Sequence, residues 1–84
     1  MSIKVKNGIE ISPSGYLFNT ETGESFVLNA TGAEILEYLR IGMNTENIAD
    51  KMSEEHKIDK YRLLSDLEDY LYLLKQYELI TDEE

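Results

Sequence analysis

The chain has 84 residues, which is enough for one small domain and leaves no room for a second. It carries 17 acidic residues against 8 lysines and arginines, a formal net charge of −9, which disfavours binding to nucleic acids and anionic membranes because Lys and Arg make those contacts. It contains no cysteine, which excludes disulfides, zinc–thiolate sites and a thiol nucleophile.

The first part of the chain predicts a meander of three antiparallel strands. Residues 1–12 alternate apolar with polar side chains, which is the period of a strand, although Asn7-Gly8 interrupts them with a dipeptide typical of tight turns. Residues 12–15 form a turn cluster, and residues 20–23 are typical of a hairpin loop. The second and third strands are therefore expected at Tyr16–Asn19 and Glu24–Leu28.

The third strand runs into a helix without a loop. Asn29 stands at the right place for an N-cap, while Thr31 and Glu34 have capping-box spacing and leave the first helical residue open by one or two positions. Gly32 lies inside the first turn, where glycine costs about 1 kcal/mol relative to alanine. This favours close packing of the turn against the sheet or the third helix; the alternative is that a ligand approaches the backbone there.

Three helices are predicted after the strands, each with an apolar stripe at helical spacing. Gly42 is placed to end the first helix and Asp59 to cap the third. The expected bounds are about Ala30 to Ile41, then Asn44 or Thr45 to about His56, then Asp59 to about Glu78. The stripes consist of Ile35, Leu36, Tyr38 and Leu39; Ile48, Ala49 and Met52; and Leu63, Leu67, Tyr70, Leu71 and Leu74.

The order of these elements indicates a fold class. Strands first and helices after predict a winged-helix-like α+β fold, in which a three-stranded antiparallel β-sheet is followed by three α-helices. Leu79-Ile80 closes the predicted core, and residues 81–84 are expected to form a frayed acidic tail. We expect a single domain spanning residues 1–84, in which residues 1–15 give only a weak strand signal interrupted by turns.

The chain lacks a group of residues suited to catalysis. Its one histidine, His56, follows Glu54-Glu55 at the end of a predicted helix, where the helix dipole favours a solvated cation. A metal site would need three or four converging ligands, and no phosphate-binding glycine motif is present. We expect no catalytic residue, no metal, no cofactor and therefore no enzymatic activity.

The sequence also contains information about the protein's location and about nucleic-acid binding. No apolar run approaches the roughly 18 residues of a transmembrane helix, and the N-terminal residues lack the apolar core of a signal peptide, so we expect a cytoplasmic protein that binds no membrane. A winged-helix protein that binds DNA through its third helix is the alternative function. Asp66, Glu68 and Asp69 along the exposed side of that helix would repel phosphate, which argues against it.

Two features suggest a surface for another polypeptide. The strand at Glu24–Leu28 lies at the edge of a three-stranded meander, where unpaired N–H and C=O groups accept a further strand unless Glu24 or the C-terminal helix protects them. The third helix carries more apolar side chains than a core stripe needs, since Tyr61, Tyr72 and Leu73 fall well outside that stripe. These side chains suit an enlarged core, a peptide groove or a homodimer interface.

A more specific pattern begins at the junction of strand and helix, with Leu28-Asn29 and Thr31-Gly32-Ala33-Glu34-Ile35-Leu36. It continues with Gly42, Ile48-Ala49, Asp66-Leu67 and Leu74 to Ile80. Over residues 16–80 this pattern resembles the PqqD-like family, the precursor-peptide recognition elements of ribosomally made, post-translationally modified peptides. Glu78 stands where the family usually has glycine, which leaves the end of the third helix open, and the segment before Tyr16 matches nothing closely.

This resemblance implies that the leader segment of a precursor peptide docks as an extra strand on the third strand, in a groove beside the third helix. The peptide-binding residues that it implies are Glu24, Ser25, Phe26, Val27, Leu28, Tyr61, Leu64, Ser65 and Glu68. Which flank of the third helix faces the groove is not decided, so a site built with Leu73 and Tyr77 stays open. Lys60 and Arg62 could attract an acidic leader.

A protein of this kind would hold the leader through backbone hydrogen bonds and would itself do no chemistry. The resemblance implies a second partner, a peptide-modifying enzyme such as a radical enzyme or a leader protease. At that enzyme the bound leader would raise the effective concentration of the core peptide.

Overall fold

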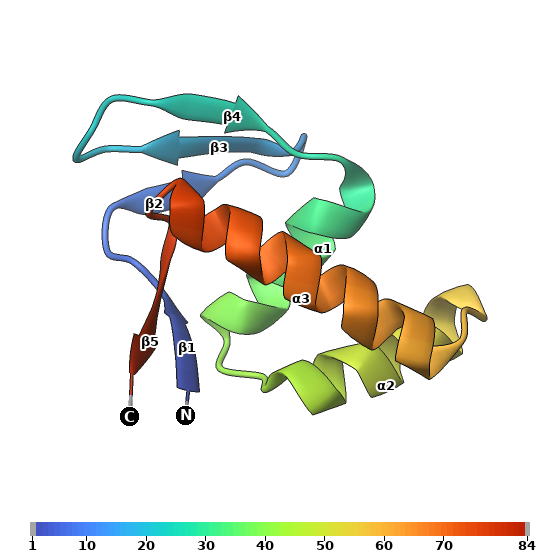
Figure 1. Ribbon diagram of the computed structural model, residues 1–84. Helices are drawn as coiled ribbons and strands as arrows, with labels where there is room; N and C mark the ends of the chain where they lie inside the picture. Colours follow the sequence, from blue (N-terminus) through green and yellow to red (C-terminus); the bar gives the residue numbers. More distant parts are fainter. Residues whose placement is uncertain (1, 84) are drawn as a thin grey trace.

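The computed structural model describes residues 2–83, which form two small antiparallel sheets and three helices (Figure 1). This confirms the predicted α+β class, although the name winged-helix describes the arrangement only approximately. The elements are β1 (Ser2–Val5), β2 (Ile9–Ile11), β3 (Tyr16–Asn19), β4 (Ser25–Val27), α1 (Ala30–Arg40), α2 (Thr45–His56), α3 (Lys60–Gln76) and β5 (Ile80–Glu83).

The N-terminal segment forms two strands that belong to different sheets. The predicted meander is β2–β3–β4, in which Leu17 pairs with Ile11 on one side and Phe26 on the other. The chain turns at residues 7–8, where Gly8 has a φ of 87°. Beyond that turn β1 does not extend the meander, because it pairs with β5 in a separate two-stranded sheet.

The C-terminal segment corrects a prediction. Residues 81–83 were expected to fray, but they continue β5, in which Lys4 lies opposite Thr81 and Ile3 opposite Asp82. Lys75 of α3 forms an ion pair with Asp82, which ties this strand to the helix. The prediction was wrong because an acidic segment of this kind is typical of a solvated tail. Its strand partner, β1, is at the other end of the chain, so no local pattern indicates the pairing. Glu84, the last residue of the predicted tail, lies outside the described residues.

Each helix begins at a predicted cap, and for the first two helices the structure decides between the alternatives that the sequence left open. The side-chain oxygen of Asn29 accepts a hydrogen bond from the Gly32 N–H at 2.7 Å, and Asn44 and Asp59 cap α2 and α3 in the same way. The first helix therefore starts at Ala30, and the capping-box signal at Thr31 does not mark its start. The third helix ends at Gln76, two residues before the predicted end.

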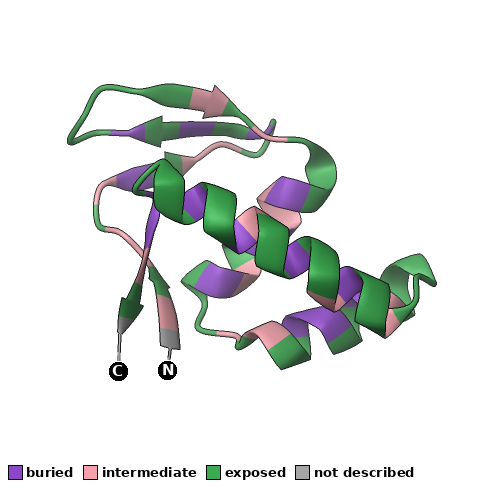
Figure 2. Ribbon diagram, viewed as in Figure 1, coloured by how far each residue is buried: buried purple, intermediate pink, exposed green. Residues whose placement is uncertain are grey.

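The core lies between the three-stranded sheet and the helices, and α3 contributes one continuous buried stripe to it (Figure 2). That stripe is Leu63, Leu67, Leu71 and Leu74, the predicted set without Tyr70, which is only half-buried. The most completely buried side chains come from both halves of the chain: Leu17, Leu36, Ile48, Met52 and Leu79. Helix α3 lies across these elements (Figure 1). One of its flanks faces β4, and the other faces α2 and the β1–β5 sheet.

Candidate functional site

Strand β4 has an open edge. The order of its sheet is β2–β3–β4, so among the described strands none pairs with its outer side. The Asn19 N–H donates to the Glu24 carbonyl at 2.9 Å, and the Leu28 N–H donates to the Gly15 carbonyl at 2.8 Å. In an antiparallel ladder hydrogen-bonded pairs alternate, so Glu24, Phe26 and Leu28 turn their backbone groups toward β3. The backbone groups of Ser25 and Val27 consequently point outward.

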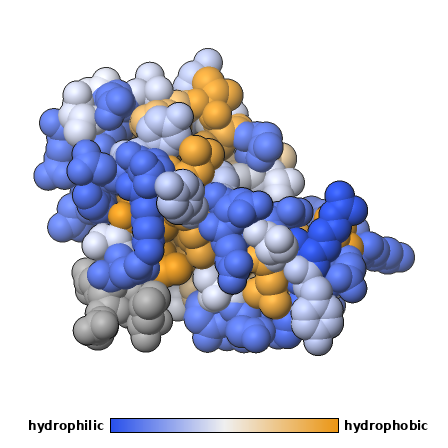
Figure 3. Space-filling view, in the orientation of Figure 1, coloured by the Kyte–Doolittle hydropathy of each residue, from blue (hydrophilic) through white to orange (hydrophobic). Residues whose placement is uncertain are grey.

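A groove of about 290 Å³ lies between this edge and α3. The rings of Phe26 and Tyr77 meet in it, with their centroids 5.1 Å apart. Figure 3 shows hydrophobic atoms at the surface between β4 and α3. The lining residues are mostly apolar: Phe26, Val27, Leu28, Asn29, Tyr70, Leu73, Leu74, Tyr77 and Leu79. A strand edge beside an apolar groove provides both backbone hydrogen bonds and a side-chain pocket.

Tyr70 lines the inner part of the groove and explains Gly32. A methyl group at Gly32 would lie 2.7 Å from the Tyr70 hydroxyl oxygen and 3.1 Å from the side-chain oxygen of Asn29. The glycine therefore makes room for α3, which confirms the packing interpretation of its unusual place in a helix. The Tyr70 hydroxyl is buried without a hydrogen-bond partner among the described residues, and burial raises the pKa of this phenol.

The other predicted helix residues lie on the opposite flank of α3. Leu64 and Glu68 line a separate cavity of about 330 Å³ together with Ile3 and Tyr72, while Tyr61 is 78% exposed. Ser65 is exposed and follows Tyr61 by four residues, which places it on the same side of the helix as Tyr61. The structure thus does not bring Tyr61, Leu64, Ser65 and Glu68 to β4.

The flank that does face β4 is the one that the sequence left open. Leu73 and Tyr77 line the groove together with Tyr70. Leu73 and Tyr77 follow Tyr70 by three and seven residues, so all three lie on one side of the helix. Tyr70 was assigned to the core from its apolar stripe, so its place in the groove was missed. The periodicity of α3 places these residues on one side of the helix but contains no information about which element that side meets.

Lys60, at the start of α3, forms ion pairs away from the groove. The Lys60 ammonium lies 2.9 Å from a carboxylate oxygen of Asp50 and 3.1 Å from one of Glu46, both in α2. Its hydrogen bonds to Asp50 and then Glu46 raise the pKa of Lys60. These ion pairs hold its charge on the α2 side of α3, away from the groove.

A second polar cluster connects α1 and α2. His56 lies 3.0 Å from a carboxylate oxygen of Glu34, and the Tyr38 hydroxyl donates to Glu55 at 3.0 Å. Burial, the hydrogen bond to Glu55 and the charge of Glu34 raise the pKa of Tyr38 to about 12. The donor atoms of Glu34, Glu55 and His56 lie within 4.8 Å of one another, but Glu55 and His56 are exposed and the group pairs within itself. This cluster links two helices, and none of its residues lines the groove.

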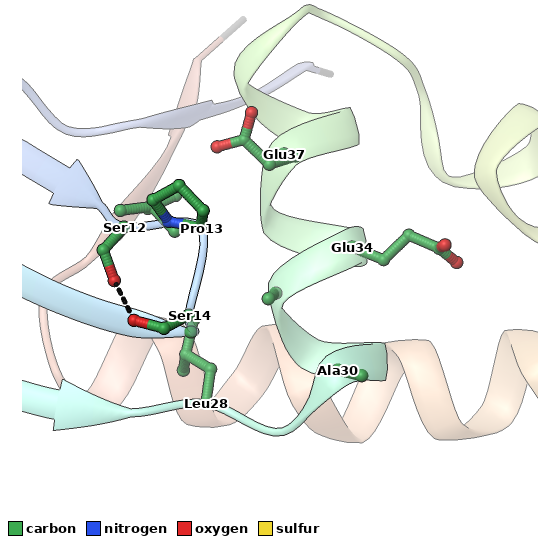
Figure 4. Close-up of a pocket in the computed structure, with 10 residues that line it drawn as sticks. Ser12, Pro13, Ser14, Leu28, Ala30, Glu34 and Glu37 are labelled. Atoms are coloured by element: carbon green, nitrogen blue, oxygen red, sulfur yellow. Dashed lines mark hydrogen bonds between the residues drawn. The ribbon is translucent and has the colours of Figure 1, made fainter.

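A cavity of about 580 Å³ lies between the turn at residues 12–15 and α1 (Figure 4). The hydroxyls of Ser12 and Ser14 lie 3.1 Å apart, and Figure 4 shows Glu37 pointing toward that turn and Glu34 pointing away from it. The two carboxylates of this cavity therefore do not converge on one point. Size alone does not make this cavity the functional site.

Comparisons with known proteins identify the family and the fold. Residues 15–80 match the family described as Coenzyme PQQ synthesis protein D (PqqD). The solved structure of TbiB1 in complex with the TbiA(β) leader peptide is 27% identical, with a TM-score of 0.87 over 96% of this chain and 98% of that chain. A lasso peptide synthetase B1 complexed with its leader peptide shares the fold at 20% identity, with a TM-score of 0.85 over 98% of this chain and 100% of that chain.

No curated protein matches the chain. Among the described residues, no helix is both long enough and apolar enough to cross a membrane.

Proposed function

The chain belongs to the PqqD family, and from this premise we propose that it binds the leader segment of a ribosomally made precursor peptide as an added strand on β4. The observation that carries the proposal is the open edge at Ser25–Val27 beside an apolar groove. Both similar structures are described as complexes with leader peptides, which supports the same class of ligand here.

The backbone supplies the first part of the binding. The outward N–H and C=O groups of Ser25 and Val27 pair with an extended leader, largely without reading its side chains. Glu24, Phe26 and Leu28 keep their backbone bonds to β3 and hold the edge straight. The rigid β3–β4 pair therefore presents an ordered template, which lowers the entropic cost of binding.

The groove supplies selectivity. Every second side chain of an added strand points to the same face, so the leader inserts alternate residues between β4 and α3. Phe26, Leu73 and Tyr77 surround that space with apolar and aromatic surface. We assign the helix side of the binding site to Tyr70, Leu73 and Tyr77, in place of the flank with Tyr61, Leu64, Ser65 and Glu68.

The protein itself does no chemistry in this proposal. It holds the leader so that the attached core peptide is concentrated at a peptide-modifying enzyme, such as a radical enzyme or a leader protease. This role requires a second interface in addition to the groove. No observation favours the DNA-binding alternative, because Asp66, Glu68 and Asp69 are all exposed on α3.

The substitution Val27→Pro tests strand addition. Proline removes an N–H that points to the open edge and is not used in pairing with β3, so the fold should survive while leader affinity falls at least tenfold. Val27→Ile is the matched control, because it keeps the N–H and the apolar side chain. The measurement is a calorimetric titration with the leader of a candidate precursor peptide from the same genome, with a ¹⁵N correlation spectrum to verify folding.

Two results would contradict the proposal. The first is a folded Val27→Pro variant that binds the leader as tightly as the unaltered protein. The second is a leader titration of the unaltered protein whose chemical-shift changes fall outside β4 and the Tyr70–Tyr77 flank of α3.

A further inference from the structure

The face of the three-stranded sheet that is turned away from the helices carries an exposed apolar row. We call Tyr16, Phe18 and Val27 the outer row; they are 57%, 42% and 75% exposed. Tyr16 lies directly opposite Val27, and Phe18 lies opposite Ser25. The neighbouring residue Leu17 is fully buried, which shows that the row faces outward. No core position explains these three side chains.

The pairing pattern places the outer row next to the open edge. Tyr16 and Val27 form a non-hydrogen-bonded pair, in which the two side chains approach most closely. Val27 is also one of the two β4 residues whose backbone groups point toward the edge. Its high exposure is what a β4 residue shows when the strand beyond it is missing.

An added strand would cover this row in part. Directly opposed residues of paired strands send their side chains to the same face of the sheet. The leader residue that pairs with Val27 therefore faces outward, beside Val27 and toward Tyr16, while the leader residues before and after it enter the groove. The leader consequently meets apolar surface on both faces of the sheet.

We propose that the outer row is a second recognition surface for the leader, which is thus read on both faces; the inference rests on the proposed function. The leader carries a large apolar residue, β-branched or aromatic, opposite Val27, and apolar residues on either side of it that occupy the groove. Its binding segment is a continuous apolar run of the kind found in strands buried on both faces. This run is a signature by which the precursor peptide can be found.

Another copy of this chain is the competing occupant of the outer row. Three side chains offer far less than the roughly 800 Å² per partner of a stable interface. Two copies that each carry a net charge of −9 also repel one another. The added strand, by contrast, is already held by backbone bonds, so a small apolar contact is enough to contribute to its selectivity.

The test is an isotope-filtered NOE experiment on the protein bound to a ¹³C-labelled leader peptide, taken from a candidate precursor of the same genome that binds in the calorimetric titration. We expect NOEs from one leader side chain to the Val27 methyls and the Tyr16 ring, and from its two neighbours to Phe26 and Tyr77. NOEs confined to Phe26 and Tyr77 in a bound complex would overturn the inference and leave the proposed function standing. Absence of any leader binding would overturn both.

A double-mutant cycle gives the second measurement. Replacing both Tyr16 and Val27 with threonine keeps β-propensity and the backbone N–H groups, and should weaken binding of the unaltered leader about fivefold. For a leader that carries serine opposite Val27, the affinities of the double variant and the unaltered protein should differ by no more than about twofold. Equal losses for the two leaders would overturn the inference, as would NOEs across the row from another copy in a leader-free dimer.

Discussion

At the scale of single residues, Glu78 occupies a backbone position that favours glycine. Its φ is 59°, and it follows α3 as Gly42, with a φ of 92°, follows α1. Both helices end with the same pair of bonds. After α3, the Leu79 N–H donates to the Leu74 carbonyl at 2.9 Å and the Glu78 N–H to the Lys75 carbonyl at 3.0 Å. After α1, the Met43 N–H donates to the Tyr38 carbonyl at 3.0 Å and the Gly42 N–H to the Leu39 carbonyl at 3.1 Å. This is the Schellman arrangement. The third helix therefore ends as a glycine-terminated helix does, with glutamate in the left-handed residue.

This comparison predicts that Glu78→Gly stabilises the protein. A residue with a Cβ is destabilised by about 1–2 kcal/mol in the left-handed region, and replacement by glycine removes this cost. The greater conformational freedom of glycine in the unfolded chain offsets part of the gain in stability. We expect the free energy of unfolding to rise by about 1 kcal/mol in urea titrations. Gly42→Ala is the reciprocal control and should lower it by a similar amount. A destabilised Glu78→Gly would show that the glutamate side chain makes a contact that outweighs its strain.

The buried hydroxyl of Tyr70 gives a further prediction at this scale. A buried donor without a partner costs about 1–3 kcal/mol, so Tyr70→Phe should raise the free energy of unfolding by about 1 kcal/mol. Tyr72→Phe, on the same helix and 66% exposed, should leave it unchanged. A loss of stability in Tyr70→Phe would mean that the hydroxyl is bonded in solution.

The same residue predicts a dependence on pH. Burial raises the pKa of Tyr70 above the usual 10.0, so the folded state disfavours the phenolate. The stability associated with the neutral phenol is fully present below pH 10 and is lost as the pH rises through the folded pKa. The advantage of Tyr70→Phe should therefore grow above pH 10, which urea titrations between pH 8 and 11 would measure. An advantage that stays constant over this range would contradict the assignment.

At the scale of elements, α3 divides the surface into two apolar regions with different neighbours. One flank meets β4 and the other meets Ile3 of β1 and Thr45 of α2. The sequence alone supported a groove on either flank, because both carry exposed tyrosines. Contact between Phe26 and Tyr77 assigns the groove beside β4 to one of them.

We therefore predict unequal effects of matched substitutions on the two flanks. Leu73→Ser and Tyr77→Ser should each weaken leader binding, by about tenfold for the aromatic residue, since a side chain of this size in an apolar pocket contributes about 1–3 kcal/mol. Tyr61→Ser, on the other flank, should change the affinity less than twofold. Calorimetric titration with one leader preparation compares all three. The reverse order of effects would return the site to the flank with Leu64 and Glu68.

At the scale of the whole molecule, the β1–β5 sheet brings the two ends of the described chain together (Figure 1). The Lys6 N–H also donates to the Leu79 carbonyl at 3.0 Å. Leu79 and Ile80 are both buried, so this small sheet is continuous with the core. Its pairing closes the fold between residues that are nearly the full chain length apart.

Removal of residues 81–84 tests this closure. The truncated chain loses the partners of Ile3 and Lys4 and should unfold with a free energy about 2 kcal/mol lower, since each intramolecular hydrogen bond contributes about 0.5–1.5 kcal/mol. Hydrogen exchange at residues 3–5 should accelerate in parallel. The matched variant Glu84→Gln, which keeps β5, should behave as the unaltered chain. Unchanged stability and exchange in the truncated chain would restore the interpretation of these residues as a frayed tail.

The amino-acid sequence by itself determined the local structure. The caps at Asn29, Asn44 and Asp59, the glycine that ends α1 and the apolar stripes of the helices all depend on residues within one or two turns of each other. The order of three short strands placed residues 24–28 at the edge of the sheet, but whether that edge is open was decided by the structure. Local hydrogen bonding and periodicity depend on residues that are close together in the sequence, so the sequence alone was enough to predict them.

The tertiary structure decided what depends on distant contacts. Asp82 of the predicted tail lies opposite Ile3, Gly32 packs against Tyr70, and Phe26 meets Tyr77. Each contact joins residues separated by dozens of positions, and periodicity gives the orientation of a side chain relative to its own helix only. The choice of flank for the groove, and the exposure of the outer row beside the open edge, therefore became visible only once the packing of α3 on the sheet was known.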